Sequence, residues 1–293
     1  MFKSSRPDSR PRIAVAGATG RVGSALLASL VSEPFDLVAL TRNPSAQRVP
    51  SGVSLARVDF DVRSSLEDAL RGADRLFLAH GTSPRQVANE IALIDAAVAA
   101  GVGQLVKLSA MGPPSRLHPM DWHMQIEAHL ATFDIGYTVL RPSTFVDILA
   151  RAGTQVADGS WGGAAGDGVV NLIDTRDVAD AARVALLDDA HPTAQRTYHL
   201  TGPRAVSMAE IAEEISKLLG RTVTYQQRSA AEQRDKLLAS GLNEFVADLL
   251  VGLDRLFHDS ALAETTSTVE NLTGHAPRSV AGWLSENISK FQK

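Results

Sequence analysis

Short apolar runs alternate with longer stretches of mixed polarity through the first two-thirds of the chain. The apolar, β-branched runs predict strands at residues 12–16, 36–40, 53–58, 76–79, 105–108 and 137–140, and the longer stretches predict helices at 24–32, 64–71, 84–100 and 121–132. Each strand–helix–strand step requires a right-handed crossover between parallel strands. The pattern therefore predicts an α/β fold, a doubly wound parallel sheet with helices on both faces.

Polar residues mark some of the expected helix ends. Ser64 opens the helix at 64–71 as an expected N-cap, and Glu67 three positions later fits a capping box. Gly101 stops the helix at 84–100. Asp177 opens a later helix and is read as its N-terminal cap rather than as a catalytic acid.

The pattern changes after Phe145. The glycine-rich stretch 153–168 predicts a loop with at most one short strand, and the later pattern predicts helices at 177–187, 207–219, 243–256 and 280–289. A strand at 197–200 is expected to rejoin the main sheet. We therefore expect a main domain over 11–152, with its sheet rejoined by about 175–202, and a smaller, mostly helical lobe over 153–293.

Composition excludes several classes of protein. Among 293 residues, 44% are apolar and 21% charged, as in ordinary globular domains, and the net charge of −4 gives no field that would attract nucleic acid. No apolar run approaches the ~20 residues that span a bilayer, and residues 1–12 form a polar tail without the apolar centre of a secretory signal. The chain has no Cys, and its histidines lack ligand spacing, so no metal site is predicted. A cytoplasmic protein without nucleic-acid or membrane partners is expected; homodimer formation is left open.

The main chemical signal is a glycine-rich turn between the first strand and its helix, Gly17-Ala-Thr-Gly20-Arg-Val-Gly23. A pyrophosphate binds backbone N–H groups at a helix N-terminus, where the helix dipole favours negative charge. Gly17 permits the tight turn, Gly20 lets phosphates approach, and Gly23 lets the helix pack close to the strand. In this context the turn predicts a Rossmann NAD(P)-binding domain with Thr19, Arg21 and Val22 in the phosphate loop. A glycine-rich turn without a ligand is the alternative.

The residue type at the end of the second strand indicates whether the domain prefers NAD(H) or NADP(H). NAD-binding folds place an acid there for the ribose 2′-hydroxyl, but this chain has Arg42, and Asp36 lies at the strand's other end. A guanidinium can hold a 2′-phosphate and stack on adenine, so NADP(H) is expected rather than NAD(H). The alternative is that Arg42 is a solvated loop charge. Asp59 and Phe60, after the third strand, are expected near the adenine.

These and later motifs resemble the NmrA-like family of atypical short-chain dehydrogenases/reductases. The motifs are Gly17–Gly23, Leu40-Thr-Arg-Asn-Pro44, Asp59, Leu66-Glu-Asp-Ala-Leu70, Gly72-Ala-Asp74, Val106-Lys-Leu-Ser-Ala110, Ile126-Glu127, Tyr137-Thr-Val-Leu-Arg-Pro142, Asp177-Val-Ala179 and Tyr198-His-Leu-Thr-Gly202. The resemblance covers nearly the whole chain and weakens after about residue 222. The resemblance implies that the protein is an oxidoreductase. In detail, the chain is similar to the quinone- and triphenylmethane-dye-reductase branch of the family. The family also contains a regulator that binds dinucleotide without catalysis.

The usual proton donor of short-chain dehydrogenases is missing. Their Tyr-x-x-x-Lys motif aligns with Pro119 and His123, and proline donates no proton. The resemblance implies that His123 occupies the lysine position and that Glu127 follows it on the same helix face.

Ser109 and His123 are the catalytic candidates. His123 could bind the nicotinamide ribose or supply a late proton at an unperturbed pKa near ~6.5, or pack structurally beside Trp122. Ser109 ends the fifth strand at the ligand-binding edge, where it could bind ribose or substrate oxygen or satisfy a turn.

Residues after the fourth and sixth strands, with three apolar side chains, complete the expected site. His80 and Gly81 follow the fourth strand and are expected to line the cofactor groove, although His80 could equally face water. Arg141 and Pro142 end the sixth strand, where the resemblance implies contact with nicotinamide and substrate. Met111, Phe145 and Trp161 could wall an apolar pocket or belong to the core.

The sequence thus favours an NADPH-dependent reductase of an apolar small molecule such as a quinone, enone or dye. Direct hydride transfer to a delocalised acceptor needs no tyrosine, and catalysis would rest on proximity and orientation. Two alternatives keep the fold: a non-catalytic sensor of NADP(H), and a cyclase or isomerase without net redox chemistry.

Overall fold

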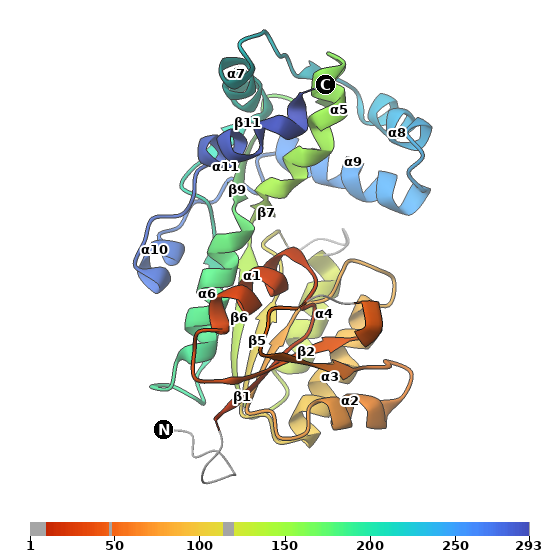
Figure 1. The fold of residues 1–293 in the computed structure, drawn as a ribbon. Coiled ribbons are helices and arrows are strands. Elements are labelled where there is room, and N and C mark those ends of the chain that lie inside the picture. The colour runs from red at the N-terminus through yellow and green to blue at the C-terminus, as the bar shows by residue number, and fades with distance from the viewer. Residues whose placement is uncertain (1–9, 47–48, 114–119, 293) are drawn as a thin grey trace. The chain divides into compact units, whose positions relative to one another are not determined.

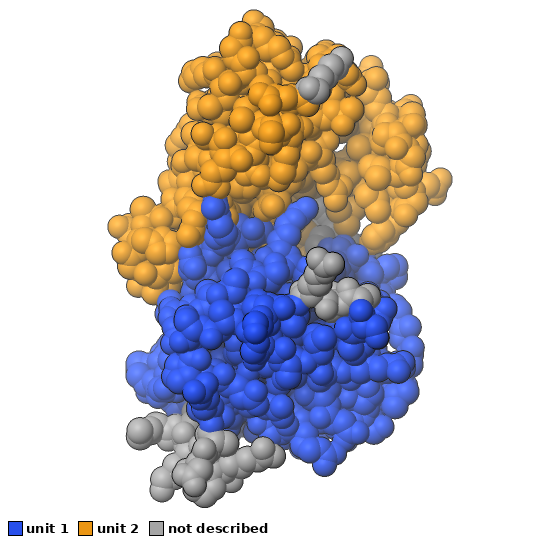
Figure 2. Space-filling model, viewed as in Figure 1, with its two compact units in different colours: residues 1–110, 121–141, 175–199 blue, residues 111–120, 142–174, 200–293 orange. Residues whose placement is uncertain are grey.

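A computed structural model describes residues 10–46, 49–113 and 120–292 (Figure 1). The chain divides into two compact units (Figure 2). Unit 1 comprises residues 1–110, 121–141 and 175–199, and unit 2 comprises residues 111–120, 142–174 and 200–293. The chain leaves unit 1 and returns to it, so each unit takes segments from both sides of residue 152.

Unit 1 is built on a seven-stranded sheet in the order β10-β6-β5-β4-β1-β2-β3. The strands are β1 (Arg12–Val15), β2 (Asp36–Thr41), β3 (Val53–Arg57), β4 (Arg75–Leu78), β5 (Gln104–Leu108), β6 (Gly136–Pro142) and β10 (Gln195–Leu200). Every pairing from β3 through β6 is parallel. From β1 the chain builds the sheet outward on one side and then, from β4, on the other. The strand order therefore reverses between β1 and β4, where such folds bind ligands at the carboxyl edge.

Helices cover both faces of this sheet, as predicted for a doubly wound fold. They are α1 (Arg21–Leu30), α2 (Arg63–Ala69), α3 (Gln86–Ala99), α4 (Met120–Leu130) and α6 (Thr175–Leu187), with a short 3-10 turn η1 (Pro44–Ala46). Helices α2, α3 and α4 bury apolar side chains such as Leu66, Leu93 and Ile126 in one core with the strands. Helices α1 and α6 pack against each other (Figure 1). The predicted return of the strand near Tyr198 to the main sheet is confirmed.

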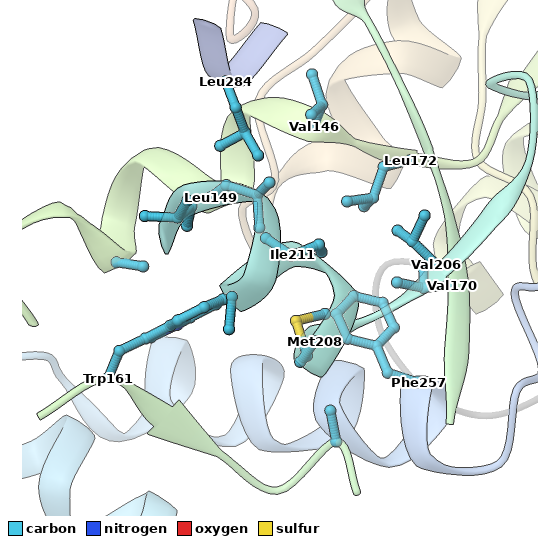
Figure 3. Close-up of a cluster of buried hydrophobic side chains, with 14 of the residues drawn as sticks. Val146, Leu149, Trp161, Val170, Leu172, Val206, Met208, Ile211, Phe257 and Leu284 are labelled. Carbon is cyan, nitrogen blue, oxygen red and sulfur yellow. The ribbon is translucent and has the colours of Figure 1, made fainter. Parts of the chain in front are cut away.

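Unit 2 contains more β-structure than the predicted mostly helical lobe. Strands β7 (Thr144–Phe145), β9 (Val169–Ile173) and β11 (Ala205–Ser207) form a three-stranded sheet, and β8 (Gly162–Gly163) pairs with β12 (Gln226–Gln227). The helices are η2 (Val146–Ala152), α5 (Gly153–Ala157), α7 (Met208–Leu219), α8 (Ala230–Ala239), α9 (Glu244–His258), α10 (Thr268–Thr273), α11 (Val280–Asn287) and η3 (Ile288–Phe291). Trp161, Met208, Ile211 and Phe257 lie in one apolar cluster (Figure 3), so Trp161 is a core residue.

The glycine-rich stretch is more ordered than a loop. It contains the short strand β8, as expected, but it begins with helix α5, and strand β9 directly after it was not predicted. A Cβ on Gly162 would lie 2.1 Å from the carbonyl oxygen of Gln226. Glycine at this position permits close approach of β12, so its occurrence does not indicate a flexible loop.

Two predicted helix caps are wrong. Helix α2 begins at Arg63 with Val62 at the N-cap position and no side-chain cap, so Ser64 lies inside the helix. Arg63 instead pairs with Glu67 one turn later. Helix α6 begins at Thr175, which makes Asp177 the third helical residue, fully buried, rather than the cap. Among the described residues no helix is long and apolar enough to cross a bilayer.

Candidate functional site

The glycine turn of unit 1 is constrained at two of its three glycines. Gly17 has a φ of +71°, and a Cβ there would lie 2.8 Å from the carbonyl oxygen of Ala79 on the neighbouring strand connection. Gly23 lies in the first turn of α1, and a Cβ there would lie 2.2 Å from the carbonyl oxygen of Gly17. The expected reason for Gly23 was contact with the strand. The structure shows instead that Gly23 lets helix α1 lie against the turn itself.

The N-terminus of α1 is open to an anion. Gly20 is its N-cap residue and provides no side-chain cap, and the first turn contains no acidic residue. The initial N–H groups of a helix have no intrahelical partner, and the helix dipole adds partial positive charge there. These features suit a phosphate group.

A groove of about 790 Å³ lies at the carboxyl ends of β1, β2 and β4. Seven of the residues predicted to bind cofactor line it: Gly17, Thr19, Gly20, Arg42, Phe60, His80 and Gly81. The sheet thus brings together segments separated by up to about sixty positions in the sequence, because parallel strands all end at one edge.

The other predicted cofactor residues do not line this groove. Arg21, Val22 and Gly23 lie in the first turn of α1, with Val22 buried. Pro142 ends strand β6, and its carbonyl oxygen accepts a hydrogen bond from the Met111 N–H at 2.8 Å within unit 2. Asp59 lines an adjoining hollow of about 280 Å³, which shares Arg42 with the groove.

Arginine side chains dominate this adjoining hollow. Arg42, Arg57 and Arg85 line it together with two aspartates, Asp59 and Asp61. Arg85 pairs with Asp61 and lowers the pKa of that carboxyl group. The segment after β2 supplies Arg42 where an NAD-binding fold would have an acid. Because Arg85 is paired with Asp61, Arg42 and Arg57 are the guanidinium groups of this hollow that would suit an additional phosphate.

His80 is engaged at both ring nitrogens. Its Nδ1 lies 2.6 Å from the carbonyl oxygen of Gly81, and its Nε2 lies 2.9 Å from the amide Nδ2 of Asn89. The imidazole also packs edge-to-face with the Phe60 ring, with the two ring centroids 5.8 Å apart. Donation from Nδ1–H and acceptance at Nε2 satisfy both contacts, so His80 is a fixed part of the groove wall and does not simply face water.

Ser109 is part of a three-residue polar cluster. Its hydroxyl donates to Glu127 on α4, and the same carboxylate accepts two-pronged donation from Arg141 on β6. Arg141 has a raised pKa because of this carboxylate. The single hydrogen of Ser109 is thereby committed, so its oxygen can accept a hydrogen bond from a ligand but cannot donate one.

His123 belongs to a second, more deeply buried cluster. Its Nδ1 lies 3.1 Å from the ammonium of Lys107, which pairs with Glu90 at 2.7 Å. Its Nε2 lies 3.4 Å from the amide Nε2 of Gln86. Burial and the charge of Lys107 lower the pKa of His123 to about 2. The expectation of an unperturbed pKa is wrong, and His123 is a neutral imidazole at physiological pH.

Sequence reasoning missed four polar residues of this region: Gln86, Asn89, Glu90 and Lys107. Asn89 and Glu90 line the groove, and the Glu90 and Lys107 side chains are fully buried. One signal was available, because a lysine within the apolar run of β5 must find a counter-charge if the strand is buried. Pro119 lies outside the described residues.

Comparison with known proteins gives a consistent result. The model of the NmrA-like family matches residues 9–271. Quinone oxidoreductase 2 of Escherichia coli is 32% identical over 276 residues, 92% of this chain and 96% of its own length. The NAD(P)H azoreductase of Xenophilus azovorans is 30% identical, covering 95% and 99% respectively. The reductase character that the motifs implied is shared by these full-length relatives.

Solved structures support the same fold. The NADPH complex of the Escherichia coli NADPH-dependent quinone oxidoreductase superposes with a TM-score of 0.83 at 28% identity, covering 94% of this chain and 98% of that one. The NADP(H) complex of Citrobacter sp. triphenylmethane reductase gives a TM-score of 0.84 at 22% identity, with coverage of 94% and 99%. At that identity the second likeness concerns the fold alone.

Proposed function

This chain belongs to the NmrA-like family, and on that premise we propose that it is an NADPH-dependent reductase of an apolar, conjugated small molecule, such as a quinone, enone or dye. The supporting observation is the groove at the switch point of the sheet, where the open N-terminus of α1 adjoins an arginine-lined hollow. Two relatives over nearly the whole chain are named as a quinone oxidoreductase and an azoreductase, which supports this class of substrate.

The residues of unit 1 fit a dinucleotide phosphate. The backbone at Gly17, Thr19 and Gly20 would hold the pyrophosphate, and Arg42 would bind the 2′-phosphate that distinguishes NADP(H) from NAD(H). Phe60 and Asp59 would lie near the adenine, and His80 and Gly81 would follow the cofactor toward its nicotinamide. Arg21, Val22, Gly23 and Pro142 remain part of the proposed cofactor site as supports or neighbours of this path.

The chemistry requires little from the chain beyond positioning. NADPH, when bound, would supply the hydride. Ser109 would accept a hydrogen bond from a ligand hydroxyl or amide, because its own hydrogen is committed to Glu127. A delocalised product anion can take its proton from water, so the missing tyrosine does not prevent reduction. Proximity and orientation would supply most of the rate enhancement.

The proposal also includes the cellular location and the oligomeric state of the protein. A cytoplasmic location gives a reductase access to the NADPH pool, and cell fractionation with an antibody tests it. The oligomeric state, monomer or homodimer, can be measured by light scattering.

Steady-state kinetics test the activity directly. Purified protein is mixed with NADPH and a panel of quinones, enones, azo dyes and triphenylmethane dyes, and the loss of NADPH absorbance is followed. Deuterated NADPH then reports whether the hydride reaches the product. Tight binding of NADPH without transfer to any acceptor would contradict the proposal and favour a nucleotide sensor. Product formed without NADPH would favour a cyclase or isomerase.

A further inference from the structure

A lysine and a glutamate form an ion pair that is wholly inside unit 1. The Nζ of Lys107 on β5 lies 2.7 Å from the Oε2 of Glu90 on α3, and both side chains are 0% exposed. Removing two charges from water costs free energy that attraction and further hydrogen bonds must offset. Within the described part of the chain the Glu90 Oε2 accepts no hydrogen bond of regular geometry. The attraction between the opposite charges of Lys107 and Glu90 therefore stabilises this contact.

The hydrogens of Lys107 determine the state of its neighbour. The ammonium donates to the carbonyl oxygen of Leu108 and lies 3.1 Å from the Nδ1 of His123. An ammonium group has three hydrogens and no lone pair, so it can only donate. The Nδ1 of His123 is therefore the acceptor of this bond, and the single hydrogen of the neutral imidazole lies on Nε2.

That Nε2 hydrogen is not taken up by the neighbouring glutamine. The amide Nε2 of Gln86 donates to the Oε1 of Glu90 at 2.9 Å and lies 3.4 Å from the Nε2 of His123. Turning the amide over would place its oxygen against the Glu90 carboxylate, so Glu90 fixes the amide orientation. The two facing nitrogens then both carry hydrogens. Gln86 therefore cannot accept the hydrogen of His123.

We propose that Lys107, kept charged by Glu90, is a positioning residue that fixes His123 as a neutral donor through Nε2 and reserves that hydrogen for an oxygen atom of a bound ligand. The ligand part rests on the proposed function, because it supposes that cofactor or substrate reaches His123. The role differs from acid catalysis. A neutral imidazole N–H stabilises negative charge on an oxygen without giving up its proton.

The opposite state of the cluster follows if Lys107 loses its proton. The free amine would accept from Nδ1–H, and the Nε2 of His123 would accept from the Gln86 amide. Burial lowers the pKa of Lys107, while Glu90 and, less strongly, Glu127 oppose that shift. These two carboxylates and Lys107, on α3, α4 and β5, are the charged groups that decide between the two tautomers.

Nitrogen NMR of the imidazole rings tests this directly. The full chain is labelled with ¹⁵N-histidine, and the His123 signals are identified by their loss in His123→Gln. The expected spectrum shows a neutral ring with hydrogen on Nε2 that does not titrate as pH falls from 8 to 5. A wild-type ring with hydrogen on Nδ1, or one that titrates in this range, would overturn the proposal without any further variant.

Variants then assign the cause to Lys107. Lys107→Met combined with Glu90→Gln leaves a neutral interior, which avoids an unpaired buried charge. In this double variant no ammonium donates to the Nδ1 of His123 and no carboxylate fixes the Gln86 amide, so the ring should no longer be held in a single tautomer, and the His123 pKa should rise. Lys217→Met, which removes a surface lysine paired with Glu214, should leave the His123 signals unchanged. Persistence of the Nε2–H form in the double variant would refute the role of Lys107.

Ligand addition separates this inference from the proposed function. Saturating NADP⁺, with and without a quinone, should shift the Nε2–H signal of His123. If neither ligand shifts it, the reserved hydrogen has no ligand partner and that part of the inference fails. The tautomer experiment needs no turnover, so its result does not depend on the outcome of the reductase assay.

Discussion

A Cβ on Gly23 would lie 2.2 Å from the carbonyl oxygen of Gly17, so these two glycines fix how closely helix α1 approaches the turn before it. Gly17 itself lines the groove, as does Gly20 at the N-cap of α1. The close contact therefore links a stability requirement to the proposed phosphate site.

Gly23→Ala is expected to destabilise the protein by about 3 kcal/mol, since the added methyl group meets main-chain atoms that cannot rotate away. Urea unfolding measures this loss, and NADPH affinity should fall with it. The matched control is Gly101→Ala, at a φ of +77° with nothing within 4 Å of the added Cβ. That change costs only the left-handed backbone, about 1–2 kcal/mol. Equal losses at the two positions would argue against the close contact.

Arg42→Ala is expected to weaken NADPH binding by on the order of 1–3 kcal/mol, about 5- to 150-fold, because a charge-assisted contact to phosphate is removed. NADH binding should change little. Isothermal titration calorimetry with both nucleotides gives the comparison. Arg63→Ala serves as control, since Arg63 is an exposed arginine on α2 paired with Glu67. If the variant loses NADPH and NADH affinity to the same extent, Arg42 does not bind the 2′-phosphate.

The stability of the protein should decrease in mild acid because of His123. Its folded pKa of about 2 lies below the ordinary value near 6.5, so the unfolded chain binds a proton that the folded chain does not. The contribution is present above pH 6.5 and is lost as pH falls. Between pH 7 and 5.5 the loss should amount to about 1 kcal/mol.

Urea titrations at several pH values check this linkage. His123→Gln should abolish that part of the pH dependence, whereas His191→Gln, which changes an exposed histidine, should largely retain it. Parallel pH curves for wild type and His123→Gln would show that His123 titrates normally in the folded protein.

Ser109→Ala is expected to raise the KM for NADPH or acceptor, or to lower turnover, by about tenfold, because a ligand loses one hydrogen-bond acceptor. Ser109→Thr keeps the hydroxyl and should restore most of the activity. Thermal unfolding of both variants separates binding from stability. If Ser109→Ala changes stability but neither kinetic constant, the hydroxyl serves only to hold Glu127.

The local features of the site could be predicted from the sequence. The glycine turn, Arg42 after β2, and His80 after β4 all follow recognisable strands, and parallel strands end at one edge of the sheet. Secondary-structure period, turn chemistry and motif spacing act over a few residues, so they can be read along the chain. The parallel sheet and the return of β10 were predicted on the same basis.

Features that depend on close approach between distant segments were missed or misread. The glycines around β8 suggested a loop, but Gly162 makes room for β12, more than sixty residues later. Helix α2 starts at Arg63 although Ser64 has the better capping chemistry, since Ser65 accepts the N–H of Asp59 and fixes the preceding turn.

By itself, the sequence determined the parallel sheet, its phosphate-binding turn and the cationic residue after β2, because these depend on neighbours in the chain. Only the tertiary structure decided the chemical state of the candidate catalytic side chains. His123 meets Lys107, sixteen positions earlier, and Lys107 meets Glu90 on another helix. The protonation of a buried side chain depends on the charges and hydrogen-bond donors packed around it. Those neighbours come from distant parts of the chain, so they cannot be identified from the sequence alone.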